Sequence, residues 1–278
     1  TYNLDPKSLG LALEGCGRLG LRPRAVIAVD LFGQTADYAP IEAFCAANGL
    51  TLICDSAQGF GATYKGRRTG SIGDFTTASF FPAKPLGCYG DGGAIVTDND
   101  EHAHVIRSLR FHGKGDDKYD NVRIGMNSRL DTIQAAILLE KLAIFEEEIA
   151  ARQIVAQRYD AALADVAIVP YVMPDCVSVW AQYTIRVPAA DRADFMAGMR
   201  DKGVPTNVYY PKPLNQQTAY KRFPVAGNGL PVSERVCREV VSLPMHPYLD
   251  ADTQDYIIAA ARELLVARDK RAGTGPRA

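Results

Sequence analysis

The apolar positions in the first third of the chain fall into two short runs with an amphipathic segment between them. The runs cover residues 25–30 and 50–55, and residues 40–48 form the segment between them. A continuous apolar run of this length is typical of a strand buried on both faces of a parallel sheet. A strand, a helix and a strand in this order predict a right-handed βαβ unit. Further strands are predicted over residues 76–81 and 93–96.

The pattern changes after Asn127, where apolar residues recur at the spacing of a helix. This spacing predicts one long amphipathic helix that continues to Tyr159. The remaining patterns predict a smaller α/β domain from these elements: strand 180–187, helix 192–202, strand 206–210, and helices 233–241 and 253–268. We therefore predict an α/β protein with a large domain over residues 1–148, a small C-terminal domain over residues 149–270, and a disordered tail over residues 271–278.

Composition narrows the class of protein. The chain has 278 residues, of which 47% are hydrophobic and 23% charged, and its formal net charge is −1. This balance is that of a globular protein, and it provides no excess of Lys and Arg for a nucleic-acid surface. No apolar segment is long enough to cross a bilayer, and no secretion leader opens the sequence. We therefore expect a protein that binds neither nucleic acid nor membrane.

Cysteine and histidine usage points to the compartment. The six cysteines lie far apart without a CxxC pair, which indicates reduced thiols and a cytoplasmic protein. His102 and His104 have no further His or Cys beside them, so we predict no metal site.

The chain starts at Thr1, and the Asp5-Pro6 pair predicts that a helix opens a few residues later. We therefore expect that an N-terminal segment is missing.

The candidate chemistry centres on Lys84, which stands among apolar residues and turn-forming residues in the segment 79–87. Such a lysine is either a surface cation or a desolvated amine, and desolvation lowers the pKa of an amine and makes it nucleophilic. Asp55 ends a predicted strand, at the edge of an open α/β sheet where ligands bind. Enzymes that use pyridoxal phosphate need an amine for a Schiff base and a carboxylate on the pyridine nitrogen. Lys84 and Asp55 are the candidate pair.

Four motifs carry a resemblance to a known family. They are DSAQ at residues 55–58, SFFPAK at 79–84, GDGGA at 90–94 and GMNSR at 125–129. Their order resembles that of the DegT/DnrJ/EryC1/StrS family, which consists of sugar aminotransferases that use pyridoxal phosphate, and the resemblance runs from about residue 1 to residue 268. It implies the fold of fold-type I transferases: a large domain with a mostly parallel sheet, here truncated at its N-terminus, and a smaller C-terminal α/β domain.

The resemblance implies a role for each matching residue. Lys84 matches the lysine that binds the cofactor covalently and then carries a proton between substrate and cofactor. Asp55 matches the carboxylate on the pyridine nitrogen, and Gln58 the residue that packs against the cofactor ring. Ser79 resembles the hydroxyl donor to the cofactor phosphate. Asn127 resembles an asparagine that reaches the phosphate of the neighbouring subunit, which implies a homodimer with shared active sites.

Each of these residues also has a structural interpretation. Asp55 could cap a helix or a turn, Gln58 could face water from a turn, and Ser79 could be an ordinary strand residue. Asn127 could do no more than cap the long helix, a position that asparagine favours.

The substrate side of the site is implied by three further residues. Arg129 could offer a charged fork to a carboxylate or phosphate of the substrate, although a helix-surface arginine is the alternative. Tyr209 and Tyr210 match a family segment that lines the pocket for the sugar nucleotide, although aromatic residues in a strand are more often part of the core.

The motifs are most similar to a branch that aminates a nucleotide-linked 3-oxo sugar, with UDP-2-acetamido-2-deoxy-3-oxo-glucuronate as substrate. The implied reaction takes an amino group from glutamate, releases 2-oxoglutarate, and passes the amine to the ketosugar during the biosynthesis of a surface polysaccharide or amino sugar. In this reaction Arg129 would bind the carboxylate of the uronate.

The sequence leaves other functions open. The alternative is an inactive or regulatory member that keeps the fold and binds ligand without turnover. A dehydratase of the same fold, with histidine in place of the lysine, is disfavoured by Lys84. The residues that hold the cofactor phosphate in the family lie before Thr1, so we expect the chain as given to bind the cofactor weakly.

Overall fold

The computed structural model describes residues 1–117 and 119–273, whose contacts form two compact units. The four-stranded unit comprises Pro23–Glu146 and Pro174–Val179. The two-stranded unit comprises Thr1–Arg22, Glu147–Met173 and the described residues from Trp180 onward. The change of unit at residue 147 is close to the expected boundary at 148, whereas residues 1–22 are grouped with the C-terminal part. Because such units are groups of contacts, the division into a large and a small domain stays a prediction.

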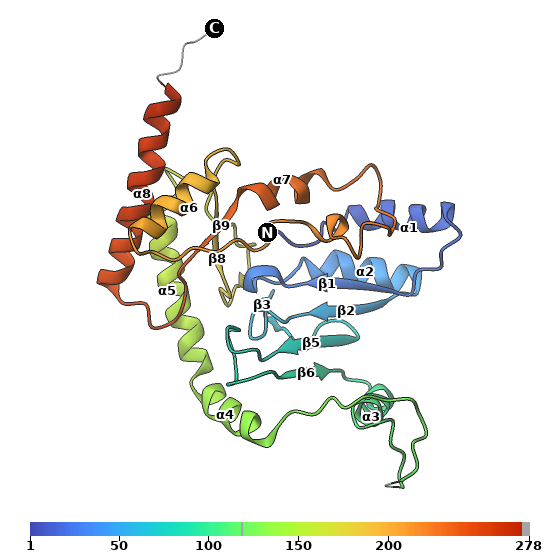
Figure 1. The fold of residues 1–278 in the computed structure, drawn as a ribbon. Coiled ribbons are helices and arrows are strands. Elements are labelled where there is room, and N and C mark those ends of the chain that lie inside the picture. Colours follow the sequence, from blue (N-terminus) through green and yellow to red (C-terminus); the bar gives the residue numbers. More distant parts are fainter. Residues whose placement is uncertain (118, 274–278) are drawn as a thin grey trace. The chain divides into compact units, whose positions relative to one another are not determined.

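The four-stranded unit is built on a sheet with the strand order β1-β2-β5-β6. Neighbouring strands are parallel from β1 through β5, and β6 runs antiparallel to β5 (Figure 1). The elements are β1 (Ala25–Val29), η1 (Leu31–Gly33), α2 (Tyr38–Asn48), β2 (Thr51–Asp55), β3 (Thr63–Tyr64), β4 (Arg67–Arg68), β5 (Phe75–Ser79), β6 (Gly93–Val96), α3 (Asp100–Leu109), α4 (Thr132–Ala143) and β7 (Cys176–Val177). The β1-α2-β2 segment confirms the predicted βαβ unit.

The two faces of this sheet differ in exposure. Residues Val26 and Ala28 of β1 are buried on one face, where Leu52 and Cys54 of β2 are also buried. On the opposite face Ile27 is 61% exposed. The prediction that the first strand is buried on both faces is therefore wrong. The reason is that successive side chains of a strand point to opposite faces of the sheet, and the face that carries Ile27 and Val29 stays open to solvent.

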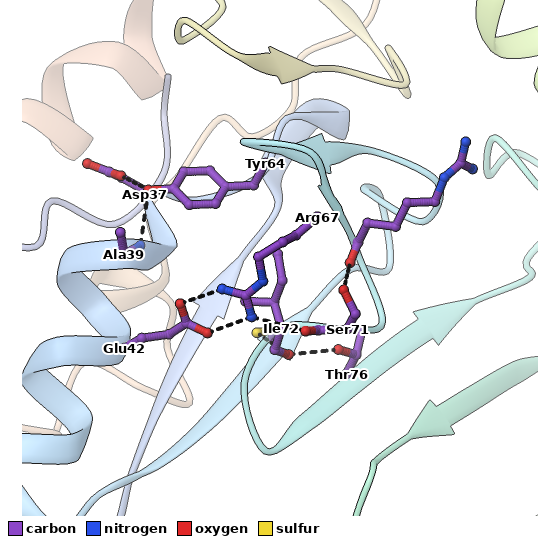
Figure 2. Close-up of polar contacts among 10 residues, drawn as sticks. Asp37, Ala39, Glu42, Tyr64, Arg67, Ser71, Ile72 and Thr76 are labelled. Carbon is purple, nitrogen blue, oxygen red and sulfur yellow. Dashed lines mark hydrogen bonds and ion pairs between the residues drawn. The ribbon is translucent and has the colours of Figure 1, made fainter.

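The long connection from β2 to β5 is fastened to α2 by polar contacts (Figure 2). The Tyr64 hydroxyl donates to Asp37 Oδ1 over 2.5 Å, just before the start of α2. Arg67 donates to both carboxylate oxygens of Glu42 over 2.8 and 2.9 Å, and also to the carbonyl of Ser71 over 3.0 Å. A two-pronged arginine–carboxylate contact fixes orientation as well as distance. These contacts keep the connection beside the helix and bring the chain back to the sheet at β5.

The two-stranded unit has its own core. Its elements are α1 (Ser8–Arg18), β8 (Tyr183–Arg186), α6 (Arg192–Asp201), η2 (Leu214–Gln216), α7 (Pro231–Glu239), β9 (Val240–Leu243), α8 (Ala251–Gly273) and, from Glu147 onward, α5 (Phe145–Leu163). Tyr159 and Tyr183 are fully buried with their ring centroids 4.7 Å apart. Their hydroxyls donate to Pro244 O over 2.9 Å and to Asp160 Oδ1 over 2.6 Å. Large aromatic rings can fill this core because each buried hydroxyl has a partner.

The structure corrects four of the predicted elements. The long helix is two helices, α4 and α5, because Ile144 leaves helical geometry between them. Residues 206–210 form only an isolated bridge, Asn207 to Ser242, instead of a strand. The helix predicted to end at Val241 ends at Glu239, where a buried β-branched pair begins β9. Residues 271–273 belong to α8 and are not a disordered tail, and residues 274–278 lie outside the described residues.

Among the described residues, no helix combines the length and the apolar composition that a bilayer crossing requires.

Candidate active site

Lys84 lies in the loop from residue 80 to residue 92, which connects β5 to β6; we call this segment the lysine loop. Its backbone N–H donates to the carbonyl of Phe81 over 2.9 Å, which forms a tight turn directly after the strand. The side chain is half-buried. Burial lowers the pKa of the Lys84 amine, and the negative charge of Asp55 acts in the opposite direction. Lys84 is thus a partly desolvated amine within the electrostatic reach of Asp55.

Asp55 is the last residue of β2 and pairs in register with Thr77 of β5. Its Oδ1 atom accepts from the backbone N–H of Ala57 over 3.1 Å and from the Thr77 hydroxyl over 3.4 Å. In the described residues these two donors both reach Oδ1, so Oδ2 is the oxygen available to a ligand. A carboxylate held by one oxygen can meet a cationic ring nitrogen with the other. Sequence reasoning did not identify Thr77, although its alternation with Ser79 places both on the face of Asp55.

A second carboxylate, Asp30, is fully buried at the end of β1 and was also missed. It accepts from the Tyr38 hydroxyl over 2.6 Å, from the Ser56 hydroxyl over 2.5 Å and from the Ala36 N–H over 3.0 Å. Burial raises its pKa to about 6, and these hydrogen bonds lower the pKa only in part. Since Ser56 directly follows Asp55, this network fixes the backbone that carries the candidate cofactor carboxylate.

Gln58 is buried, and its Oε1 accepts from the backbone N–H of Phe32 over 2.7 Å. Phe32 has a positive φ of 62°, a conformation that a non-glycine residue adopts only when its surroundings hold it there. The alternative of a turn glutamine that faces water is therefore wrong. Gln58 joins the loops after β1 and β2, and its place against a cofactor ring stays a prediction.

Ser79 ends β5 on the same face of the sheet as Asp55 and is half-buried. Its hydroxyl oxygen accepts from the backbone N–H of Phe81 over 3.3 Å, at the start of the lysine loop. The hydroxyl hydrogen can therefore be directed to an anionic ligand on this face.

Asn127 and Arg129 lie in an exposed segment before α4. Arg129 Nε donates to Asn127 Oδ1 over 2.9 Å, and its guanidinium lies 5.2 Å from the centroid of the Phe111 ring. Asp131 occupies the N-cap position of α4, so the alternative that Asn127 caps the helix is wrong. Asn127 and Arg129 line a cavity of about 910 Å³ together with Thr77 of the open sheet face. The cavity thus connects this segment to the sheet next to Asp55.

Tyr209 and Tyr210 belong to the two-stranded unit and do not form part of a strand. Their ring centroids are 5.6 Å apart, and Tyr210 is 49% exposed. An aromatic side chain left so open does not belong to the core, which removes the core alternative for Tyr210. The contribution of both residues to a sugar-nucleotide pocket stays a prediction.

In the part of the chain that the structure describes, no group of three or more His, Cys, Asp or Glu side chains is arranged to bind a metal ion. His102 instead stacks on Phe75, with ring centroids 4.9 Å apart.

The residues present suit pyridoxal phosphate. A half-buried amine, a carboxylate with one oxygen available and a hydroxyl for the phosphate converge at one edge of an α/β sheet, where such sheets bind ligands. These are the donor types that hold the aldehyde, the pyridine nitrogen and the phosphate of this cofactor. The fold and the site therefore define an enzyme of the class that depends on pyridoxal phosphate.

Comparison with known proteins agrees with this class. Residues 1–262 match the DegT/DnrJ/EryC1/StrS aminotransferase family. The UDP-2-acetamido-2-deoxy-3-oxo-D-glucuronate aminotransferase of Pseudomonas aeruginosa is 49% identical over 261 residues, which cover 94% of this chain and 69% of that protein. A DegT DnrJ EryC1 StrS aminotransferase from Brucella abortus superposes with a TM-score of 0.92 at 49% identity, over 95% of this chain and 70% of the other. NtdA from Bacillus subtilis, solved with bound cofactor PMP, has a TM-score of 0.83 at 30% identity, over 96% and 60% of the two chains.

The chain belongs to the DegT/DnrJ/EryC1/StrS aminotransferase family. It is an aminotransferase that uses pyridoxal phosphate, and its fold is that of the family's solved members.

Proposed function

We propose that this enzyme transfers an amino group from glutamate to a nucleotide-linked 3-oxo sugar, and that the acceptor is UDP-2-acetamido-2-deoxy-3-oxo-glucuronate. The observation that supports this acceptor is the 49% identity to the Pseudomonas aeruginosa enzyme named for it. The exposed guanidinium of Arg129, which lines the cavity next to the sheet, supports an acidic sugar because a guanidinium binds a carboxylate in a two-pronged geometry. The product would enter the biosynthesis of a surface polysaccharide or amino sugar.

Lys84 is the proposed catalytic residue. When bound, pyridoxal phosphate supplies an aldehyde for amines and a protonated ring that takes up an electron pair. The Lys84 amine would hold this aldehyde at rest. Once a substrate amine has taken its place, Lys84 Nζ would accept a proton from the substrate carbon and give it up to the cofactor carbon. Partial burial suits both tasks, because a lowered pKa increases the neutral fraction of the amine.

The other candidate residues bind and orient. Asp55, through the oxygen that its backbone and Thr77 contacts leave available, holds a proton on the ring nitrogen. Ser79 donates to the phosphate, and Gln58 keeps the loop after β2 in place against the ring. We propose that Asn127 acts on the phosphate of a second subunit, as part of a homodimer, and that the enzyme works in the cytoplasm.

A two-stage assay tests the proposal. The chain loaded with pyridoxal phosphate is given glutamate alone, and then UDP-2-acetamido-2-deoxy-3-oxo-glucuronate or its analogue without the carboxylate. We expect 2-oxoglutarate in an amount stoichiometric with enzyme at the first stage and continued turnover at the second, faster with the uronate. The matched control is Lys84→Ala. If other amino acids but not glutamate support the first stage, the donor is wrong, and if both sugars react equally well, the acidic acceptor is wrong.

A further inference from the structure

We propose that Gln134 and Lys141 of α4 are positioning residues that hold the lysine loop and thereby the amine of Lys84. This inference rests on the proposed role of Lys84. It adds a pair of residues on another element that act on the amine through the loop backbone.

The two residues contact the loop on either side of Cys88. The Lys141 ammonium donates to the carbonyl of Gly87 over 2.6 Å, and the backbone N–H of Tyr89 donates to Gln134 Oε1 over 2.8 Å. Gln134 and Lys141 are seven residues apart, which is two helical turns, so they project from the same side of α4. The helix therefore grips the loop at two points with side chains that reach backbone atoms.

The rest of the loop has a different support. Its base is closed by backbone hydrogen bonds, from Cys88 N to Phe80 O and from Phe80 N to Gly92 O, both 2.8 Å long. Cys88 is part of this closure, and its sulfur also lies 3.0 Å from the carbonyl oxygens of Phe80 and Gly90. Its two neighbours, Gly87 and Tyr89, have the contacts to α4. A side chain at Gly87 would bring its Cβ to 2.6 Å from the Pro82 carbonyl oxygen, so the chain is closely folded there. The two α4 contacts add to the loop's own hydrogen bonds and tie this closely folded segment to the helix.

The Lys141 contact is stronger than that of an exposed side chain. Lys141 is half-buried and directs its charge to a neutral carbonyl, which gives a charge-assisted hydrogen bond of the stronger kind. Its neighbour Glu140 is exposed on the same helix. The loop that receives the contact carries the half-buried Lys84, three residues before Gly87. A loop released from α4 would admit water to Lys84, whose amine would return toward its ordinary pKa.

The test uses two readouts on the full chain. Hydrogen exchange of residues 86–90 measures the hold on the loop. Reductive methylation with formaldehyde across a pH series, followed by mass spectrometry of the Lys84 peptide, measures the neutral fraction of the Lys84 amine. Asp55 is the charged group that acts on the pKa of this amine. We expect Lys141→Met and Gln134→Leu to speed exchange and to move the Lys84 profile to higher pH, with about tenfold less labelling at a given pH for each pKa unit.

Matched variants separate positioning from folding. Lys141→Arg keeps a cationic donor and should keep the wild-type Lys84 profile, and Glu140→Gln should not change it. Gln134→Glu keeps an acceptor oxygen and should keep the slow hydrogen exchange of residues 86–90. An unchanged Lys84 profile in folded Lys141→Met and Gln134→Leu would overturn the inference, as would a failure of both to fold, because the contacts would then serve the fold alone. A shifted profile in an enzyme whose Lys84→Ala variant still transfers amino groups would instead overturn the proposed function and leave the positioning role of Gln134 and Lys141 intact.

Discussion

The lysine loop and the segment from Asn127 to Arg129 carry candidate site residues in two different ways. The loop is closed at its base by backbone hydrogen bonds, is held by α4, and keeps Lys84 half-buried. In the other segment the backbone is hydrogen-bonded to Arg110 through Ser128, whereas the side chains of Asn127 and Arg129 are exposed and bond to each other. A group that carries out chemistry needs a fixed position and a shifted pKa, whereas a group that recognises a ligand can be ordered when the ligand binds. Changes in the first region should therefore alter turnover, and changes in the second should alter substrate affinity.

The largest effect in the fixed region, apart from Lys84 itself, is expected from Asp55→Asn. An amide cannot hold the ring nitrogen in its cationic form, so the rate of amino transfer should fall by about 10²- to 10³-fold, the range for loss of one preorganised electrostatic partner. The rate of 2-oxoglutarate formation from glutamate measures this. Asp98→Asn, at an exposed aspartate after β6, serves as the control. A fall of only a few-fold would place the ring nitrogen elsewhere.

The buried Asp30 network in the fixed region should make the free energy of unfolding depend on pH. The pKa of Asp30 is raised from 3.8 to about 6 by burial, so protonation favours the folded state. Its stabilising contribution is complete below the unfolded pKa and is lost as pH rises through about 6, a change of about 3 kcal/mol. Asp30→Asn stays neutral and should lose this part of the pH dependence, as measured by urea unfolding at about pH 4 and about pH 7. If wild type and variant show the same difference between the two pH values, Asp30 is already ionised in the folded protein.

The smallest effect is expected in the exposed segment. Arg129→Ala should raise the KM for the uronate about fivefold, which corresponds to about 1 kcal/mol for a solvent-screened charge contact, with kcat nearly unchanged. Arg129→Lys keeps the charge and should lie between the variant and wild type. An equal rise in KM for the sugar without a carboxylate would show that Arg129 recognises another part of the substrate. A large fall in kcat would break the distinction between the two regions.

The sequence was sufficient for the part of the fold that depends on local patterns. The apolar runs at β1 and β2 predicted the βαβ unit, and the position of Asp55 at the end of a strand followed from them. The break at Ile144 was missed because apolar residues continue at helical spacing on both sides of it. The start of β9 was missed because Val240 and Val241 fit the helical pattern of α7, and only pairing with β8 makes them a strand.

Site residues that belong to sequence motifs could be predicted. Residues that are far apart in the sequence and meet only in the folded chain could not. Lys84 and Asp55 stand in recognisable segments, and the charge of one acts on the other in the structure. Asp30 gave no signal, because a carboxylate after an apolar run is typical of a turn. Its partners Tyr38 and Ser56 are 8 and 26 residues away along the chain. The contacts of Gln134 and Lys141 to the lysine loop span 45 and 54 residues, and no sequence pattern reports them.

The most direct test of the account is covalent capture of the cofactor. The chain is incubated with pyridoxal phosphate, reduced with borohydride, digested and analysed by mass spectrometry, with Lys84→Ala treated in parallel. The account predicts one specific adduct at Lys84, formed in the unsubstituted protein and lost in the variant. Specific capture at a different lysine, or an adduct of equal yield in Lys84→Ala, would contradict it.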